Sequence, residues 1–154
     1  MSSASLLPTD RVPNPYDVAG FQLWQSANEW ERFVNTALEP FGVNQSEVFQ
    51  LISLVVAARQ QEGVGEVTQV LLAQLTGTHV MTVSKILRSL EKKQLIVRTV
   101  GRDARAKALR ITKAGEQLLI ETTGALMEAN NNFFPAAGRA ELVAYLQTRN
   151  STNT

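Results

Sequence analysis

The chain has no cysteine among its 154 residues and only one histidine. Without thiols, a disulfide framework, a thiolate metal site and a thiol redox sensor are all excluded. A single histidine gives little support to a zinc site or to a histidine-based catalytic centre. We therefore expect no metal and no cofactor.

Long apolar runs are also missing. The richest run, LISLVVAA at 51–58, is too short to cross a bilayer. Residues 1–15 lack the basic segment and apolar stretch of a signal peptide. We expect no membrane partner and a cytoplasmic location.

Signals of catalysis are absent as well. The chain shows no Gly-rich phosphate loop, no nucleophile–histidine pattern and no cluster of metal ligands. Glu116, Glu121 and Glu128 have the spacing of a solvated helix face. The sequence therefore predicts that the protein is not an enzyme.

Charge is distributed unevenly, although the net charge is only +1. Residues 79–113 hold ten basic and two acidic residues, or +8, and the remainder of the chain carries −7. A solvated surface explains a short charge run, but this asymmetry favours a polyanionic partner at one face. Nucleic acid is the partner that such a basic segment indicates.

Hydrophobic spacing predicts helices in the first part of the chain. Residues 1–15 contain three prolines and predict an extended arm. From Asp17 to Phe41, apolar residues recur every three to four positions, as on one face of a helix. Asn44 and Glu47 predict a capping box for a second helix. Its interior at 48–58 is apolar nearly all round, so we expect this helix to be buried.

The second part combines short helices with two strands. Thr68 and Thr112 are predicted N-caps of a short and a long helix. The predicted elements, in chain order, are a helix from 68 to about 76, a helix at 79–93, strands at 95–100 and 108–111, a helix at 113–131, a break at 133–135 and a helix at 139–149.

Two helices separated by a tight turn, at 68–76 and 79–93, form a helix-turn-helix pattern. In such a unit the second helix enters the major groove of DNA. The apolar residues of the second helix form one stripe, which consists of Val80, Val83, Ile86, Leu87 and Leu90. Val83, Ile86, Leu87 and Leu90 can dock the helix on its scaffold. The candidate DNA-contacting residues are Thr78, His79, Met81, Thr82, Ser84, Lys85 and Arg88.

Side-chain chemistry suits these candidates to DNA. Hydroxyl groups contact phosphates or bases, and Arg and Lys favour guanine or phosphate. Met81 is expected either to touch a thymine methyl group or to pack against the protein. His79 is expected either to meet a phosphate or base edge or to be an ordinary surface residue. The sequence leaves both pairs of alternatives open.

The two strands and the basic loop GRDARAK (101–107) between them predict a wing. A narrow minor groove concentrates negative potential and attracts an arginine from such a loop. We expect Arg102 and Arg105 near the wing tip and Asp103 as a hydrogen-bond partner that holds an arginine in position. Lys107 and Arg110 are expected to follow the DNA backbone.

Residues 68–119 resemble the DNA-binding core of the MarR (multiple antibiotic resistance regulator) family. The matching motifs are T-Q-x-x-L-A, T-V-S-x-x-x-x-x-L-E-K-K and D-x-R-x-x-x-x-x-I-T, the last followed directly by K-A-G-E. The resemblance implies a mainly α fold with a small β-wing, a winged helix-turn-helix flanked by N- and C-terminal dimerisation helices. It also implies a homodimer that binds a pseudo-palindromic operator in double-stranded DNA, usually as a repressor.

Residue roles carry over by position. The resemblance implies that Thr82, Ser84, Lys85 and Arg88 are recognition-helix contacts and that Asp103 and Arg105 are the wing pair. The implied organisation is an arm at 1–15, N-terminal helices at 16–60, the winged helix-turn-helix at 61–112 and C-terminal dimerisation helices at 113–150.

One position departs from the family pattern. Gln94 stands where the family has glycine after L-E-K-K. A side chain in the left-handed conformation costs about 1 kcal/mol, so we expect the helix to end differently here. The start of the first wing strand is then left open.

Aromatic residues lie mostly outside the basic segment and have two interpretations. One is a place in the core and the dimer interface. The other is a pocket for a small aromatic or lipophilic effector between the dimer body and the DNA-binding lobes, with Trp24 and Trp30 as its candidate lining. For the whole chain, the alternative to a DNA-binding regulator is a winged-helix module that docks on an acidic protein.

Overall fold

The computed structural model describes residues 12–62, 64–102 and 107–151. Most of the predicted arm lies outside them, and the first long helix begins at Ala19 rather than at Asp17. The elements in chain order are η2 (Pro15–Asp17), α1 (Ala19–Leu38), η3 (Glu39–Phe41), α2 (Gln45–Gln60), α3 (Gln69–Thr76), α4 (Val80–Lys92), β1 (Ile96–Val100), β2 (Lys107–Ile111), α5 (Lys113–Phe133) and α6 (Arg139–Ser151).

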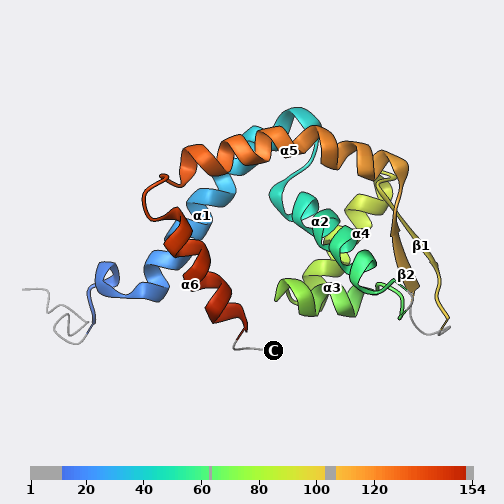
Figure 1. Cartoon of the computed structure of the whole chain (residues 1–154), viewed down its shortest axis with the longest axis horizontal. Coiled ribbons are helices and arrows are strands. Elements are labelled where there is room, and N and C mark those ends of the chain that lie inside the picture. The colour runs from blue at the N-terminus through green and yellow to red at the C-terminus, as the bar shows by residue number, and fades with distance from the viewer. Residues whose placement is uncertain (1–11, 63, 103–106, 152–154) are drawn as a thin grey trace, which may run out of the picture.

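The chain forms an arch under the long helix α5 (Figure 1). Helix α1 packs along α5 on one side of the arch, and α6 lies on the same side in this view. Helices α2, α3 and α4 and the β1–β2 pair form a lobe on the other side. A mainly helical chain with a small antiparallel sheet confirms the predicted fold class. Among the described residues, no single helix is long and apolar enough to cross a membrane, and two bent helix pairs meet that test only as pairs.

Helix boundaries follow the predicted caps. The backbone N–H of Glu47 donates to Asn44 Oδ1 at 3.0 Å, and the N–H of Asn44 donates to Glu47 Oε2 at 3.1 Å. The hydroxyls of Thr68 and Thr112 likewise accept backbone bonds at the starts of α3 and α5. Helix α3 ends at Gly77, whose φ of 62° is left-handed. These local signals therefore confirm the order of elements.

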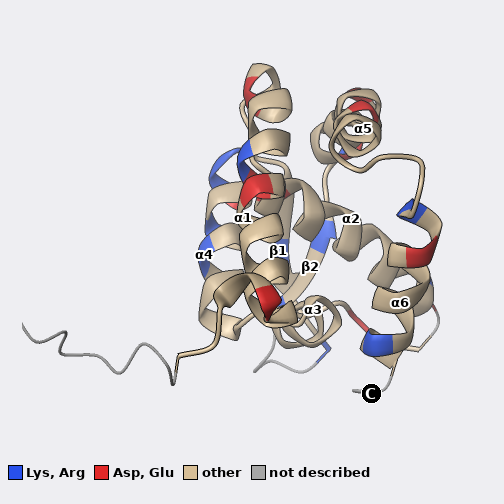
Figure 2. Cartoon of the chain, turned by 90° about the vertical axis from the view of Figure 1, so that its left-hand side faces the viewer, with Lys and Arg blue, Asp and Glu red and all other residues tan. Residues whose placement is uncertain are grey.

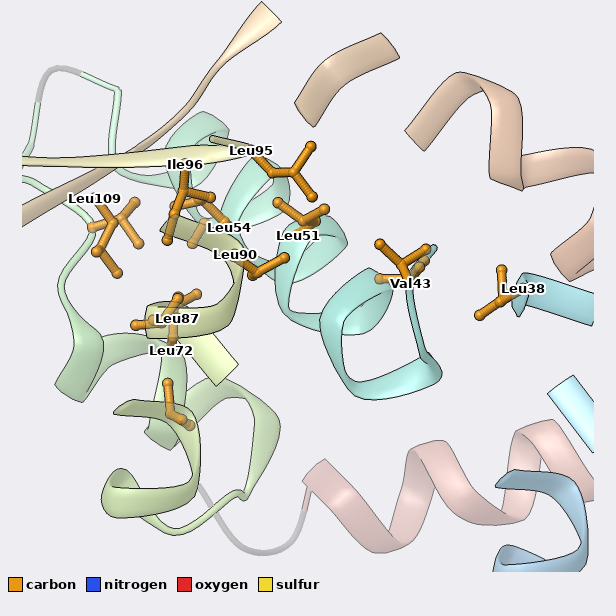
Figure 3. Packing of buried hydrophobic residues seen from close by; sticks show 14 of the residues in the cluster. Leu38, Val43, Leu51, Leu54, Leu72, Leu87, Leu90, Leu95, Ile96 and Leu109 are labelled. Atoms are coloured by element: carbon orange, nitrogen blue, oxygen red, sulfur yellow. The ribbon is translucent and has the colours of Figure 1, made fainter. Parts of the chain in front are cut away.

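The core of the lobe joins α2, α3, α4 and the wing (Figure 3). From α4, the predicted stripe contributes Val83, Leu87 and Leu90, which are fully buried, while Ile86 is half-buried. Val80, the first residue of the stripe, is 37% exposed and is not part of the buried cluster. This leaves the beginning of α4 projecting from its scaffold.

The expectation that α2 is buried is confirmed for one side of the helix, where Val48, Leu51, Leu54 and Ala57 are buried, and is wrong for the other side. Phe49, Ile52 and Val56 are exposed, whereas the polar residues Glu47 and Gln50 are almost completely buried. The reason is that α3, α4, β2 and α5 pack against only part of the helix surface. An apolar stripe of α2 therefore remains exposed.

Gln94 adopts the left-handed conformation with a φ of 60°, so the expected departure at the end of α4 is wrong. The backbone N–H of Leu95 donates to the carbonyl of Leu90 at 3.0 Å, which is the hydrogen bond of a Schellman motif at a helix C-terminus. The hydroxyl of Thr112 donates to the carbonyl of Gln94 at 2.8 Å. These bonds offset the cost of the conformation and hold the start of β1 in place.

Gly115 allows α5 to start directly against the base of the wing. A methyl group at this position would overlap the carbonyl oxygen of Leu95 and would lie 2.7 Å from Ile111 Cγ1. The same carbonyl accepts the N–H of Thr112 at 3.0 Å. The glycine of the K-A-G-E motif is therefore a packing requirement.

Candidate nucleic-acid interface

The face of α4 opposite its buried stripe carries most of the candidate DNA contacts. Met81 is 63% exposed, Thr82, Lys85 and Arg88 are also exposed, and Ser84 is half-buried. Nε of Arg88 donates to the carbonyl of Ser84 at 3.3 Å, which directs the guanidinium along the helix. The face offers hydroxyl, ammonium and guanidinium donors together, as recognition of DNA requires.

The start of α4 explains His79 in a way that the sequence did not suggest. His79 is the N-cap, and its Nδ1 accepts the backbone N–H of Met81 at 3.2 Å. An accepting Nδ1 places the proton of the neutral ring on Nε2, which is then a donor at the exposed end of the helix. Thr78 precedes it and is half-buried; its backbone N–H donates to the carbonyl of Ala73 in α3 at 3.1 Å.

The wing is an antiparallel pair in which Ile96 lies opposite Ile111 and Val100 opposite Lys107. It is tied to the segment before α3, because the N–H of Leu109 donates to the carbonyl of Val67 at 2.8 Å. The side chains of Lys107 and Arg110 are exposed. The predicted wing strands are thus confirmed and are braced against the helix-turn-helix.

Arg102 lies just after β1 and is exposed; its backbone N–H donates to Glu66 Oε2 at 2.8 Å. This bond attaches the root of the loop to the same segment before α3. Asp103 and Arg105 fall outside the described residues, so their roles at the wing tip stay predictions.

Two residues of the basic segment serve the fold instead. Nζ of Lys93 lies 2.7 Å from Glu47 Oε2, and Nε of Arg98 lies 3.1 Å from Glu91 Oε2. The side chain of Arg98 is only 17% exposed. Counting charges along the sequence could not show that these two cations pair with carboxylates. Figure 2 shows Lys and Arg positions in blue along α4 and the wing strands, and acidic positions in red on α1.

Comparisons with known proteins agree with this arrangement. No family model matches the chain. YdcH of Bacillus subtilis (strain 168), an uncharacterized HTH-type transcriptional regulator, is 32% identical over 132 residues, which cover 85% of this chain and 88% of YdcH. The structure of S. aureus MepR in complex with DNA is 26% identical, with a TM-score of 0.72 over 88% of this chain and 98% of MepR.

The chain belongs to the MarR family. Two further members share its fold. A mutant of E. coli MarR complexed with operator DNA is 18% identical, with a TM-score of 0.72 over 84% of this chain and 91% of that one. CouR from Rhodococcus jostii RHA1 bound to p-coumaroyl-CoA is 23% identical, with a TM-score of 0.71 over 90% of this chain and 96% of CouR.

The two tryptophans of this MarR-family chain contact different residues. The Trp30 ring centroid is 5.4 Å from that of Phe133 and 5.3 Å from that of Phe134, so it joins α1 to the end of α5. Trp24 is 61% exposed and contacts Phe21. The structure does not bring Trp24 and Trp30 together in one pocket.

Two hollows border the exposed stripe of α2. The first, of about 240 Å³, lies between α2 and α5; its walls are mostly apolar and include Arg59 and Thr122. The second, of about 490 Å³, reaches from α2 to Thr82 and Ile86 of α4. Neither is lined by Trp24 or Trp30. The long apolar run of α2 was the sequence signal for these hollows, and it was interpreted as core.

Proposed function

We propose that this MarR-family protein is a transcriptional regulator that binds a pseudo-palindromic operator as a homodimer. The observation that carries the proposal is the outward face of α4, where Thr82, Lys85 and Arg88 are exposed side by side and lie next to a basic wing. The DNA complexes of MepR and MarR, which share the fold, support it. The protein would then act in the cytoplasm, without an enzymatic step, and would repress wherever its operator overlaps a promoter.

The geometry of the lobe suits the two grooves of DNA. Helix α4 would lie in the major groove, with its first turns at the base edges and Arg88 or Lys85 at guanine or phosphate. The β1–β2 loop would place Arg105 in the adjacent minor groove. The bond between Arg102 and Glu66 supports this arrangement, because it ties the root of that loop to the helix-turn-helix.

Exposed apolar side chains outside the lobe support a dimer. Helix α6 has no buried residue, although it carries apolar side chains along its length. The exposed large apolar residues of α1, α5 and α6 are Leu23, Trp24, Phe33, Ile120, Met127, Leu142, Val143 and Tyr145. A second copy of the chain would remove this surface from water, with α1 and the helices of 113–150 contributing the dimer body.

An effector site is the second part of the proposal. The hollow between α2 and α5 lies where the lobe meets the long helix of the dimer body, and Arg59 would complement an anionic group on an aromatic or lipophilic ligand. Trp24 and Trp30 stay candidates only if the partner subunit brings them near this hollow. Such a ligand would release DNA by binding more tightly to a lobe spacing that does not fit the operator.

Selection of random duplex DNA by the purified protein tests the function, followed by titration of the winning site at several salt concentrations. An enriched inverted repeat, with log affinity falling linearly with log salt, is the expected result. Selection without any enriched sequence would refute operator binding. Binding to an acidic protein through the same face would then be the explanation to test.

A matched pair of variants locates the interface. Arg88→Ala on α4 is expected to weaken the selected site by about 1–3 kcal/mol and to change the ranking of sites. Arg32→Ala removes the same charge from an exposed position on α1 and should do neither. Thr82→Ala should also alter the ranking. If Arg88→Ala and Arg32→Ala behaved alike, α4 would not be the reading helix.

A further inference from the structure

The carboxylate of Glu47 is almost completely buried, with 2% of the residue exposed, and both of its oxygens accept hydrogen bonds. Its Oε1 accepts the hydroxyl of Ser89 at 2.6 Å and Nζ of Lys93 at 2.8 Å. Its Oε2 accepts the backbone N–H of Asn44 at 3.1 Å and Nζ of Lys93 at 2.7 Å. One carboxylate thus joins the start of α2 to the last turn of α4 and the residue after it.

The charged form of Glu47 is the stable one. Burial by itself raises the pKa of Glu47, but the hydrogen bonds from Lys93, Ser89 and the backbone of Asn44 outweigh it, and the pKa lies below its usual value. A buried carboxylate held by four directed bonds tolerates little displacement of its partners.

The same bonds continue toward α1. Nζ of Lys93 also donates to the carbonyl of Gly42 at 2.8 Å, in the turn between α1 and α2. The backbone N–H of Gln45, in the first turn of α2, donates to Asn35 Oδ1 of α1 at 2.7 Å. A continuous polar path therefore runs from the end of α4 to α1. We call this set of contacts the polar joint. It consists of the bonds of Glu47 to Ser89, Lys93 and Asn44, the bond from Lys93 to Gly42, and the bond from Gln45 to Asn35.

We propose that Glu47, through this polar joint, is the positioning residue that sets the angle of α4 relative to the dimer body, and hence the half-site spacing that the protein reads. This inference rests on the proposed function as a dimeric operator-binding protein. Glu47 binds Ser89 in the last turn of α4 and Lys93 just after it, whereas Met81 and Thr82 lie in the first turn. Glu47 therefore acts through the helix rather than on DNA.

Helix geometry gives the displacement that a tilt at the polar joint would cause at the first turn of α4. From Ser89 back to Met81 the helix rises about 12 Å, at 1.5 Å per residue. A tilt of about 10° at the joint would move the reading end by about 2 Å, a large part of the 3.4 Å rise of one base pair. In a symmetric dimer both reading ends move, so the change in separation doubles.

The apolar side of α4 cannot set this angle alone. Val83, Leu87 and Leu90 hold the helix against the core, but apolar burial is non-directional and permits small rotations. Directed bonds to a buried charge select one arrangement among those that apolar packing allows. Such a specifying role is known for buried polar groups in some proteins.

The test uses three variants and the parent in the same selection of operators. Lys93→Met keeps the aliphatic stem but leaves Glu47 without its cation. The double variant Glu47→Gln with Lys93→Met removes both charges, and its glutamine can still cap α2, which guards against loss of folding. The matched control is Lys92→Met, which removes the neighbouring exposed charge; Lys92 has no ion pair within the described part of the chain.

The measured quantity is the ratio of affinities for the selected operator and for the same half-sites moved apart or together by one base pair. We expect this ratio to fall about fivefold or more in the double variant, the lower limit for one misplaced base pair. It should be unchanged in Lys92→Met. The affinity of a single half-site should change little, because the reading face is intact.

Two results would overturn the inference. One is a double variant that remains folded and dimeric and keeps the parent's spacing ratio. The other is a uniform loss of affinity at every spacing with a smaller salt slope, since Lys93 would then be a phosphate contact. If the parent itself enriched no inverted repeat, the proposed function would fail first, and the inference with it.

Discussion

Replacing Gly115 by alanine tests how tightly α5 is fitted to the wing. The added methyl group would overlap the carbonyl oxygen of Leu95 and crowd Ile111, whose Cγ1 lies 2.7 Å from the place that the methyl carbon would occupy. The Leu95 carbonyl cannot retreat freely, because it accepts the N–H of Thr112 at 3.0 Å. Either α5 must shift from the sheet or this hydrogen bond must lengthen.

The magnitude comes from opposing terms. Alanine is favoured over glycine within a helix by about 1 kcal/mol. Overpacking costs about 1–3 kcal/mol, and a weakened backbone hydrogen bond adds about 1 kcal/mol. We therefore expect Gly115→Ala to lower the free energy of unfolding by about 1–3 kcal/mol. For a chain of this length, each kcal/mol corresponds to about 2–4 °C in Tm.

Gly124→Ala is the matched control, since it makes the same change in the same helix. No heavy atom lies within 4 Å of its added methyl group, so helix propensity should raise the free energy of unfolding by up to about 1 kcal/mol. Urea unfolding of both variants at one fixed protein concentration measures the difference, because a dimer's stability depends on concentration. A Gly115→Ala protein as stable as the parent would refute the packing argument.

Four other changes have expected outcomes. Gln94→Gly should raise the free energy of unfolding by about 1 kcal/mol in urea unfolding, since it relieves a left-handed side-chain position; a loss would show that the Gln94 side chain stabilises the turn. The pKa of Glu47 is lowered from 4.5, so its contribution to stability is present above that pH and is lost as pH falls through the folded-state pKa. The difference in unfolding free energy between parent and Glu47→Gln should thus shrink below about pH 4.5, and a constant difference from pH 7 to pH 3 would contradict it. Arg105→Ala should weaken operator binding in titrations while leaving the dimer intact, and unchanged affinity would remove the wing from the interface. Truncation after residue 132 should impair dimerisation, and a stable dimer in light scattering would contradict that.

Local signals predicted the elements of this fold well. The caps at Asn44, Thr68 and Thr112 depend on side chains within three residues of the groups they bind, so their patterns are visible along the chain. The wing strands were visible for the same reason, because alternation and β-branched residues mark them directly. The candidate contacts on α4 followed from helical periodicity, which separates the buried Leu87 from the exposed Arg88.

Contacts between distant parts of the chain were not predictable in this way. Glu47 was expected only as part of a capping box, yet it also binds Ser89 and Lys93, more than 40 residues away. Lys93 and Arg98 were counted with the DNA-facing charge because a cation looks the same in sequence whether or not a carboxylate lies beside it. Gln94 was judged by its intrinsic conformational cost alone, without the Thr112 hydroxyl that binds its carbonyl.

The amino-acid sequence by itself determined the order of helices and strands, the residues of the outward face of α4 and the family to which the chain is similar. These depend on periodicity, caps and motif spacing, which act over a few residues. Only the tertiary structure decided which cations face outward, which side of α2 stays open, and how the end of α4 is held by Glu47. Such properties depend on burial and on bonds between residues far apart in the chain, and they exist only once the chain has folded.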